Sequence, residues 1–269
     1  MTRSSLVSAA GAASRIALAL SALCVATPVI ANAQDAARCA SPPEAASLEH
    51  APRHFRERVA QGLPVKIVAI GSSSTSGAGA SSSSTTYPSR LEAELKAQLP
   101  GLPVTVLNKG IGGEEASQMV ARFEADVFEE APDLVLWQVG SNSVLRDHPT
   151  PGEIIRQGVE RLKDSGAEVI LINPQYAPKI LAKPGVEHSV DVITATARDA
   201  EVGLFDRFAA MRYWSETEKI PFDQFITADG LHMNDWGYAC VAKLVANAIL
   251  EGTQLPPATA TATVGPIKR

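Results

Sequence analysis

Short apolar runs recur along the chain, each bounded by Gly, Pro, Asn or Asp. These runs cover residues 65–70, 104–107, 134–139, 169–172 and 202–205. They are rich in β-branched residues, and their apolar positions are consecutive rather than alternating. This pattern is typical of strands that are covered on both faces. The sequence therefore predicts five buried β-strands.

Segments with helical spacing lie between these runs. The predicted helices cover residues 88–98, 115–130, 152–164 and 186–200. The helical spacing is clearest near the C-terminus, where apolar side chains recur on one face at i, i+3, i+4, i+7 and i+8: Val241, Leu244, Val245, Ala248 and Ile249. Alternating strands and helices in a chain of this length predict a three-layer α/β/α fold with a mainly parallel five-stranded sheet.

The first 33 residues have the layout of a secretory signal peptide. Arg3 and Arg15 precede an apolar stretch over residues 16–30, and Ala31-Asn32-Ala33 is an A-x-A cleavage signature. We predict cleavage after Ala33 and a secreted or periplasmic protein. An uncleaved membrane anchor is the alternative, but the apolar stretch is short for a membrane span.

The rest of the chain divides into three parts. We expect an N-terminal segment over residues 34–63, a single α/β domain over residues 64–251, and a disordered tail over residues 252–269 that contains alternating Ala and Thr. Removing residues 1–33 takes away two arginines and no acidic residue, so the formal charge falls from −5 to −7. This acidic balance argues against nucleic acid as a partner.

Two cysteines follow the signal peptide, Cys39 and Cys240. Export to an oxidising compartment permits a disulfide between them. Both could equally be buried small apolar residues, because two cysteines are far weaker evidence than a framework of six. The histidines outside the C-terminal motif described below have no metal-ligand spacing, and we expect neither a metal nor a cofactor: His50, His54, His148 and His188.

The segments after the predicted strands carry unusual residues. The first strand is followed by Gly71-Ser72-Ser73, the second by a segment that runs from Asn108 to Gly113, and the third by Gly140-Ser141-Asn142. Asp229-Gly230-Leu231-His232 precedes the final helix. Open parallel sheets bind ligands at the carboxyl ends of their strands, so these residues are expected to face one cleft.

The order of these four blocks resembles that of the SGNH hydrolases, also called the GDSL esterase family, whose fold is flavodoxin-like. The resemblance spans roughly residues 64–251. It implies that Ser73 is the nucleophile, that His232 and Asp229 complete a triad, and that Ser73, Gly113 and Asn142 form the oxyanion hole. This chain departs from the family pattern at Ser72 and Ser143, where the family carries aspartate.

The chemistry explains these residue types. A serine hydroxyl is a poor nucleophile unless a base accepts its proton, and a histidine oriented by a carboxylate is suited to that task. The tetrahedral intermediate then needs hydrogen-bond donors for its oxyanion: the backbone N–H groups of Ser73 and Gly113 and the side-chain amide of Asn142. Ser72 is the rival nucleophile, one position earlier.

Each block taken alone has a simpler interpretation as a turn or a helix cap. The serine-rich stretch over residues 74–86 is predicted to be a polar, mobile loop beside the substrate. Gln175 and Tyr176 follow the fourth strand and could contact substrate, although loop packing is the alternative that we favour. There is no G-x-S-x-G elbow and no P-loop.

The sequence therefore predicts an exported serine esterase that cleaves a small-molecule or glycan ester through an acyl-enzyme, with O-acetyl groups on glycans or short-chain esters as candidate substrates. Two alternatives stay open. One is an extracytoplasmic O-acyltransferase that uses the same serine. The other is a catalytically inactive glycan-binding protein of the same family, which the two missing acidic neighbours make conceivable.

Overall fold

The computed structural model describes Met1 and residues 39–253, so the predicted signal peptide and most of the predicted tail lie outside the described residues. Five parallel strands form one sheet in the order β2-β1-β3-β4-β5. Their bounds are β1 (Val65–Gly71), β2 (Val104–Gly110), β3 (Leu134–Gln138), β4 (Glu168–Ile172) and β5 (Gly203–Phe205). Each strand coincides with one of the five predicted runs within a few residues. The predicted sheet is therefore confirmed.

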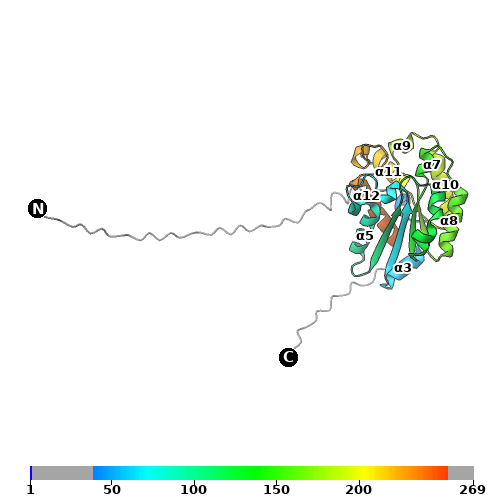
Figure 1. Cartoon of the computed structure of the whole chain (residues 1–269), viewed down its shortest axis with the longest axis horizontal. Helices are drawn as coiled ribbons and strands as arrows, with labels where there is room; N and C mark the ends of the chain where they lie inside the picture. Colours follow the sequence, from blue (N-terminus) through cyan, green and yellow to red (C-terminus); the bar gives the residue numbers. More distant parts are fainter. Residues whose placement is uncertain (2–38, 254–269) are drawn as a thin grey trace, which may run out of the picture.

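Helices cover both faces of the sheet (Figure 1). The longer ones are α3 (Arg53–Ala60), α5 (Tyr87–Gln98), α8 (Gly152–Asp164), α10 (Val186–Asp199), α11 (Arg207–Glu216) and α12 (Asp235–Leu250). The shorter ones are α2 (Pro43–Ala46), α4 (Ser73–Ser76), α6 (Ala116–Ala121), α7 (Ser141–Leu145) and α9 (Pro178–Leu181), with 3₁₀ turns η1 (Ser83–Thr85) and η3 (Phe222–Gln224) and a π-helical turn η2 (Glu124–Phe128).

Successive strand residues point to opposite faces and form two cores. In β1, Ile67 and Ala69 pack with α5, α12 and α3, whereas Val68 and Ile70 pack with α6, α8 and α10. Every one of these side chains is fully buried. Burial on both faces explains why the strands read as continuous apolar runs.

The predicted helix over residues 115–130 is wrong in its continuity. The α-helix α6 ends at Ala121, and the chain continues through the π-helical turn η2. Beside this break, buried Phe123 packs edge-on against Trp137 at 5.1 Å between ring centroids. The helices α3 and α11 were not among the segments predicted from helical spacing. The segment before the domain is not separate from it, because Phe55 and Val59 of α3 are buried in the same core.

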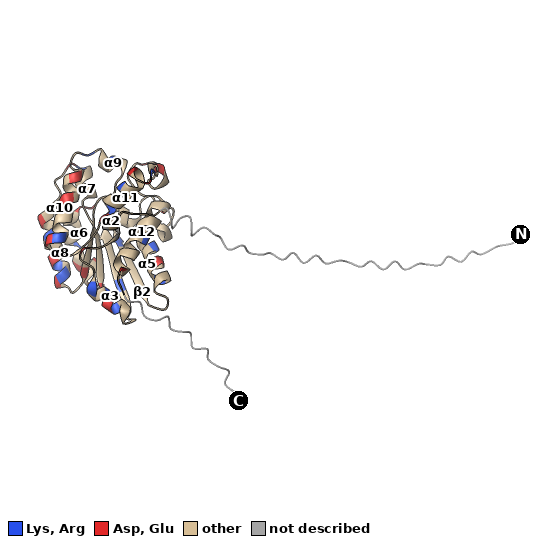
Figure 2. Cartoon of the chain, turned by 180° about the vertical axis from the view of Figure 1, so that it is seen from behind, with Lys and Arg blue, Asp and Glu red and all other residues tan. Residues whose placement is uncertain are grey.

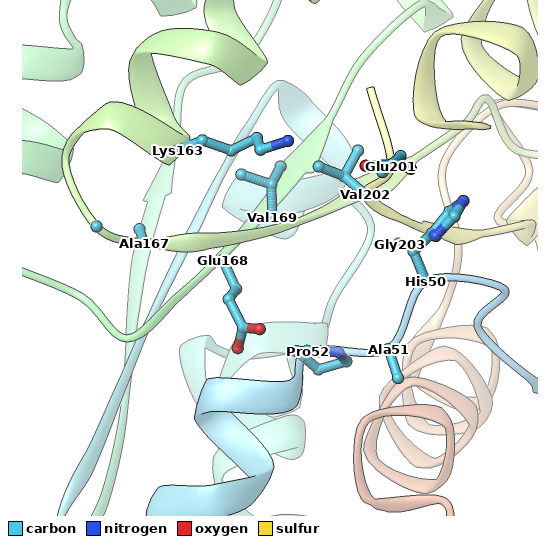
Figure 3. Close-up of a pocket in the computed structure, with 11 residues that line it drawn as sticks. His50, Ala51, Pro52, Lys163, Ala167, Glu168, Val169, Glu201, Val202 and Gly203 are labelled. Atoms are coloured by element: carbon cyan, nitrogen blue, oxygen red, sulfur yellow. The ribbon is translucent and has the colours of Figure 1, made fainter. Parts of the chain in front are cut away.

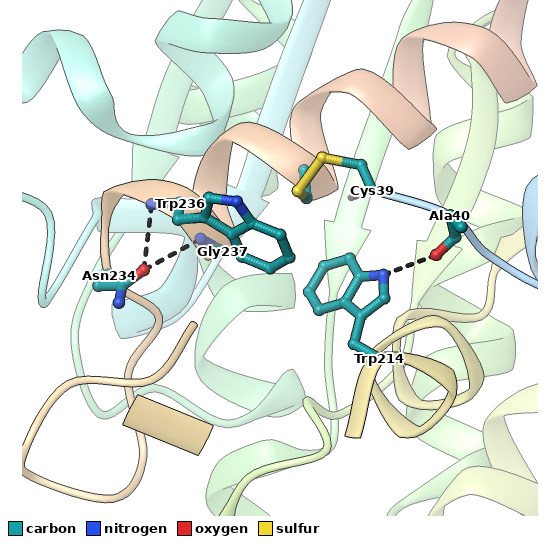
Figure 4. Close-up of a disulfide and its surroundings, with 7 residues drawn as sticks. Cys39, Ala40, Trp214, Asn234, Trp236 and Gly237 are labelled. Atoms are coloured by element: carbon teal, nitrogen blue, oxygen red, sulfur yellow. Dashed lines mark hydrogen bonds between the residues drawn. A yellow bond between two sulfur atoms is a disulfide. The ribbon is translucent and has the colours of Figure 1, made fainter. Parts of the chain in front are cut away.

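Cys39 and Cys240 form a disulfide, which the sequence had left open (Figure 4). It connects the N-terminal segment that precedes α2 to the helix α12, across a sequence separation of 201. Beside it, the indole N–H of Trp214 donates to the carbonyl of Ala40 at 2.8 Å, so the N-terminal segment has a second anchor.

Reduction of this disulfide is expected to lower the free energy of unfolding by about 2–5 kcal/mol, because the cross-link closes a long loop in the unfolded chain. The measurement is denaturant unfolding with and without reductant. A variant that carries both Cys39→Ser and Cys240→Ser is the control, and its stability should not respond to reductant. Equal stability of the oxidised and reduced wild-type protein would contradict this expectation.

Positions of basic and acidic residues are interspersed along the outer helices, for example on α8 and α3 (Figure 2). On α8, Arg156 pairs with Glu153 at 2.6 Å and also with Glu160. Such exposed pairs contribute little to stability. Within the described residues, no helix combines the length and the apolar character that crossing a bilayer requires.

Candidate active site

Ser73 and His232 lie within hydrogen-bond distance although 159 residues separate them in the chain. Ser73 is the first residue of α4, which Ser72 alone separates from the end of β1, and His232 lies just before α12. The Nε2 atom of His232 is 2.9 Å from the Oγ atom of Ser73. Both residues lie at the carboxyl-terminal end of the sheet, as the position of the blocks predicted.

Asp229 lies against the other nitrogen of the same ring. Its Oδ2 atom is 2.5 Å from Nδ1 of His232. A carboxylate can only accept, so Nδ1 carries the proton and donates it. In the neutral imidazole, Nε2 is then the acceptor and faces the hydroxyl of Ser73. This is the tautomer that a general base for the serine requires.

A turn around Asp229 holds the carboxylate in place. Its Oδ1 atom accepts from the backbone N–H groups of Leu231 at 2.8 Å and His232 at 2.9 Å, and from the hydroxyl of Thr227 at 2.8 Å. Partial burial acts to raise the pKa of Asp229, but these bonds and the one from the His232 ring outweigh it. They hold the pKa of Asp229 well below its ordinary value, so the group stays ionised.

Ser72 points away from the imidazole. It is 1% exposed, and its hydroxyl donates to Oε1 of Gln138 at 3.0 Å. Its backbone N–H donates to the same oxygen at 3.0 Å. The two neighbouring serines therefore have different environments, and it is Ser73 that contacts His232.

The three groups predicted to hold the oxyanion each keep an N–H hydrogen that is not donated within the described part of the protein, and a Cβ added at the neighbouring Gly112 would lie 3.8 Å from the Cβ of Ser73. Within the described residues, the backbone N–H groups of Ser73 and Gly113 have no protein acceptor. The side-chain amide of Asn142 donates one hydrogen to the carbonyl of Glu114 at 2.8 Å, which leaves its second hydrogen for another acceptor. Gly113 has φ +84°, a conformation that other residues rarely adopt.

The loop that carries Gly113 is held by α7 and the residue after it. Arg146 donates to the Gly113 carbonyl at 2.7 Å and to Glu115 at 2.7 Å, and Ser143 donates to Glu115 at 3.0 Å. Partial burial acts to raise the pKa of Glu115, but hydrogen bonds from Arg146, Ser143 and His148 hold it below its ordinary value. Ser143, where the family pattern has aspartate, is thus a hydrogen-bond donor to the carboxylate of Glu115.

The serine-rich stretch is not the mobile loop that the sequence predicted. Ser81 donates to the carboxylate of Asp235 from its backbone N–H at 2.8 Å and from its hydroxyl at 2.5 Å. The carbonyl of Ala78 accepts from the hydroxyl of Tyr238 at 2.6 Å. At Gly79, an added Cβ would lie 2.5 Å from the carbonyl of Met233, so this stretch packs tightly against the segment after His232.

Gln175 and Tyr176, in the loop after β4, have partners within the protein. Gln175 is 2% exposed, and its amide oxygen accepts from Ser141 and Arg207. Tyr176 is half-buried, stacks on Phe222 and donates its hydroxyl to Glu216. This placement agrees with the loop-packing alternative, and a substrate contact by either residue stays a prediction.

Two residues near the site were not predicted from the sequence. Gln138 is buried directly beneath Ser72, and its signal was a polar residue inside an otherwise apolar strand run. Ile111, between Gly110 and Gly112, is 47% exposed in the loop beside Ser73. Nothing in the local pattern distinguished this isoleucine from a core residue.

The opposite end of the sheet carries a separate depression of about 290 Å³ (Figure 3). His50, Glu168 and Gly203 are among its lining residues, and the last two begin β4 and β5. The Glu168 carboxylate there accepts the N–H groups of His54 and Phe55 at 3.0 and 2.7 Å. This hollow lies away from Ser73 and has no part in the candidate site. No cluster of metal-ligating side chains occurs in the described part of the chain.

Comparison with known proteins identifies the family. The model of the Non-GDSL lipase-like family matches residues 38–255. The chain belongs to this family. The family and the geometry around Ser73 together make the protein a carboxylic ester hydrolase.

Individual relatives are more distant. An arylesterase of Vibrio mimicus is 26% identical over 155 residues, which cover 56% of this chain and 72% of that protein. The structure of an acetyl xylan esterase from Geobacillus stearothermophilus matches with a TM-score of 0.59 at 24% identity, over 71% of this chain and 96% of that one. A two-domain esterase active on acetylated mannans matches with a TM-score of 0.63 at 23% identity, over 79% and 58% of the two chains.

Proposed function

We propose that this lipase-like hydrolase is an exported serine esterase that removes short acyl groups, acetyl above all, from glycans or small esters. The observation that carries the proposal is the Ser73–His232–Asp229 arrangement, with 2.9 Å and 2.5 Å between successive partners. Glycan esters are favoured because two of its structural relatives are described as acting on acetylated xylan and mannan. Export rests on the N-terminal sequence pattern.

The proposed reaction has two steps. His232 Nε2 takes the proton of Ser73 as the serine oxygen attacks the ester carbonyl carbon, and the imidazolium then returns that proton to the departing alcohol. Water attacks the resulting acyl-serine with the same base, which releases the carboxylic acid and restores the serine. The donors of Ser73, Gly113 and Asn142 hold the oxyanion in both steps.

The test is a series of p-nitrophenyl esters of increasing acyl length on the purified protein, followed by acetylated xylan and mannan oligosaccharides with release of acetate as the readout. We expect turnover to be highest for acetyl. Turnover that rises with acyl length would contradict the proposed substrate class. Absence of any turnover, together with no labelling by a fluorophosphonate probe, would favour the inactive glycan-binding alternative.

Product analysis addresses the acyltransferase alternative. With an acetyl donor and an excess of glycan acceptor, the hydrolase should release free acetate. Transfer of most of the acetyl groups to the acceptor would instead identify an acyltransferase.

Replacement of the proposed side-chain oxyanion donor provides a further prediction. Asn142→Ala is expected to lower kcat on p-nitrophenyl acetate by about 10²–10³-fold, because one preorganised donor is lost. The adjacent Ser143→Ala is the matched control, since Ser143 bonds Glu115 instead, and its kcat should fall less than tenfold. Equal losses of kcat in the two variants would show that a disturbance of the whole loop, and not removal of the Asn142 amide, lowers turnover.

A further inference from the structure

Arg207 is a buried cation beneath the candidate site. It is the first residue of α11 and is 1% exposed. Its Nε atom donates to the carbonyl of Asn173 at 3.0 Å and its Nη2 atom to Oε1 of Gln175 at 2.9 Å. No carboxylate forms an ion pair with it in the described part of the protein. Burial lowers the pKa of Arg207 to about 10, so it remains charged near neutral pH.

A chain of hydrogen bonds runs from Arg207 to the turn that carries Ser73. Gln175 accepts from Arg207 and, through the same oxygen, from the hydroxyl of Ser141 at 2.8 Å. Ser141 in turn accepts from Nε2 of Gln138 at 3.4 Å. The Oε1 atom of Gln138 then accepts from the backbone N–H and the hydroxyl of Ser72. We call Arg207, Gln175, Ser141 and Gln138 the interior relay.

The direction of every bond in the interior relay follows from its first member. An arginine can only donate, so Gln175 must present its oxygen to it. Ser141 must then donate to that oxygen, which leaves its own oxygen to accept from the amide nitrogen of Gln138. Gln138 therefore presents its oxygen to Ser72. With the Gln138 amide reversed, its NH₂ group would face the N–H of Ser72, and two buried donors would oppose each other.

The interior relay touches three of the four motif blocks. Gln138 holds Ser72, beside the serine that faces His232. Ser141 lies beside Asn142, the proposed oxyanion donor. The Nε2 atom of Gln175 donates to the carbonyl of Leu231 at 3.4 Å, and Leu231 directly precedes His232. One buried network thus connects segments that are far apart in the sequence.

We propose that Arg207 is a positioning residue for the esterase reaction, because it sets the direction of the interior relay and thereby fixes the turn that presents Ser73 to His232. Its effect on turnover rests on the proposed function. The proposal also explains Ser72: an aspartate there would set a carboxylate against the oxygen of Gln138, whereas serine supplies the donors that this oxygen requires.

The first test compares Arg207→Met, which removes the donors, with Arg207→Lys, which keeps a donor. We expect Arg207→Met to lower kcat on p-nitrophenyl acetate by roughly 10–100-fold with KM changed less than threefold, since displacement of reacting groups mainly affects kcat. Arg207→Lys should recover most of that loss. All assays are run well below the unfolding temperature of each variant.

Arg56→Met is the matched control. Arg56 is partly buried and, like Arg207, donates to backbone carbonyl groups, those of Ala248 and Ile249 at 2.9 and 2.8 Å, but none of its hydrogen bonds reaches a motif block. The Arg56→Met variant should be less stable than wild type, and its kcat should stay within twofold of the wild-type value. If Arg207→Met lowers stability and likewise leaves kcat unchanged, Arg207 is only structural and the proposal is overturned.

The second test places the effect in the interior relay. Ser141→Ala removes one hydroxyl from its middle, and we expect kcat to fall about 5–20-fold. Both changes interrupt the same network. The kcat of the Arg207→Met/Ser141→Ala double variant should therefore lie within about threefold of the kcat of the less active single variant. If the two losses multiply instead, the residues act independently and the relay does not exist. Should Arg207→Met fail to fold, Ser141→Ala alone carries the test, and an unchanged kcat overturns the proposal.

Hydrogen exchange gives a readout that does not depend on turnover. In Arg207→Met and in Ser141→Ala, backbone exchange in peptides that cover residues 66–78 should become faster, whereas Arg56→Met should leave these peptides unchanged. Inactive wild-type protein would contradict the proposed function, and the exchange measurement would still decide the relay. Unchanged exchange in both relay variants would overturn the relay even if the esterase is active.

Discussion

Ser73→Ala is expected to lower kcat on p-nitrophenyl acetate by about 10⁴–10⁶-fold, the range found when a triad nucleophile is removed from a serine hydrolase. The physical reason is that, among the residues that the structure describes, no other hydroxyl is hydrogen-bonded to His232, whose Nε2 atom lies 2.9 Å from Ser73 Oγ. The variant should also lose labelling by a fluorophosphonate probe. Its unfolding midpoint should stay near that of wild type, because the hydroxyl is not part of the core.

Ser72→Ala is the matched control, one residue earlier in the same turn. Its hydroxyl is buried and donates to Gln138, and the backbone N–H of residue 72 keeps its own bond to that oxygen. We expect the variant to retain kcat within about tenfold. The reverse result, with Ser72→Ala inactive and Ser73→Ala active, would show that position 72 carries the nucleophile.

The sheet could be predicted from sequence because its strands are buried on both faces. In β3, Leu134, Val135 and Leu136 leave no alternation to interpret, and the run length together with its boundaries identifies a strand. The residues of the candidate triad could be predicted because their spacing and order resemble a known family. These residues come together because all five strands are parallel, which places the loops after β1, β2 and β3 at the same end of the sheet.

Other features could not be read from local patterns, because they depend on contacts between distant residues. The serine-rich stretch reads as a flexible loop, yet Asp235 and Tyr238, about 150 residues later, hold it in place. The pattern of apolar residues does not predict α11 clearly, because its first residue, Arg207, is charged and yet buried. Ser143 stands where the resemblance implies an aspartate, and in the fold it donates to the carboxylate of Glu115, the N-cap residue of α6.

Asp229→Asn is expected to lower kcat by about 10⁴-fold, the loss that follows when an asparagine replaces the carboxylate of such a triad. The amide can turn its NH₂ group toward Nδ1 of His232, which favours the tautomer with the proton on Nε2. That proton would then oppose the hydroxyl of Ser73. Asp235→Asn is the matched control, since Asp235 bonds Ser81 and not His232, and its kcat should change only a few-fold.

The lowered pKa of Asp229 also predicts a pH dependence of stability. Because this pKa is lower in the folded than in the unfolded protein, ionisation of Asp229 stabilises the fold above the ordinary value of 3.8, and the contribution is lost as the pH falls through the folded-state pKa. Wild type should therefore have a higher unfolding midpoint than Asp229→Asn near pH 6, and this difference should shrink below pH 4. The side chain is 41% exposed, so solvent screening keeps the difference small. A difference that grows toward low pH would mean that the carboxylate is not held by the turn, and that its bond to His232 does not form in solution.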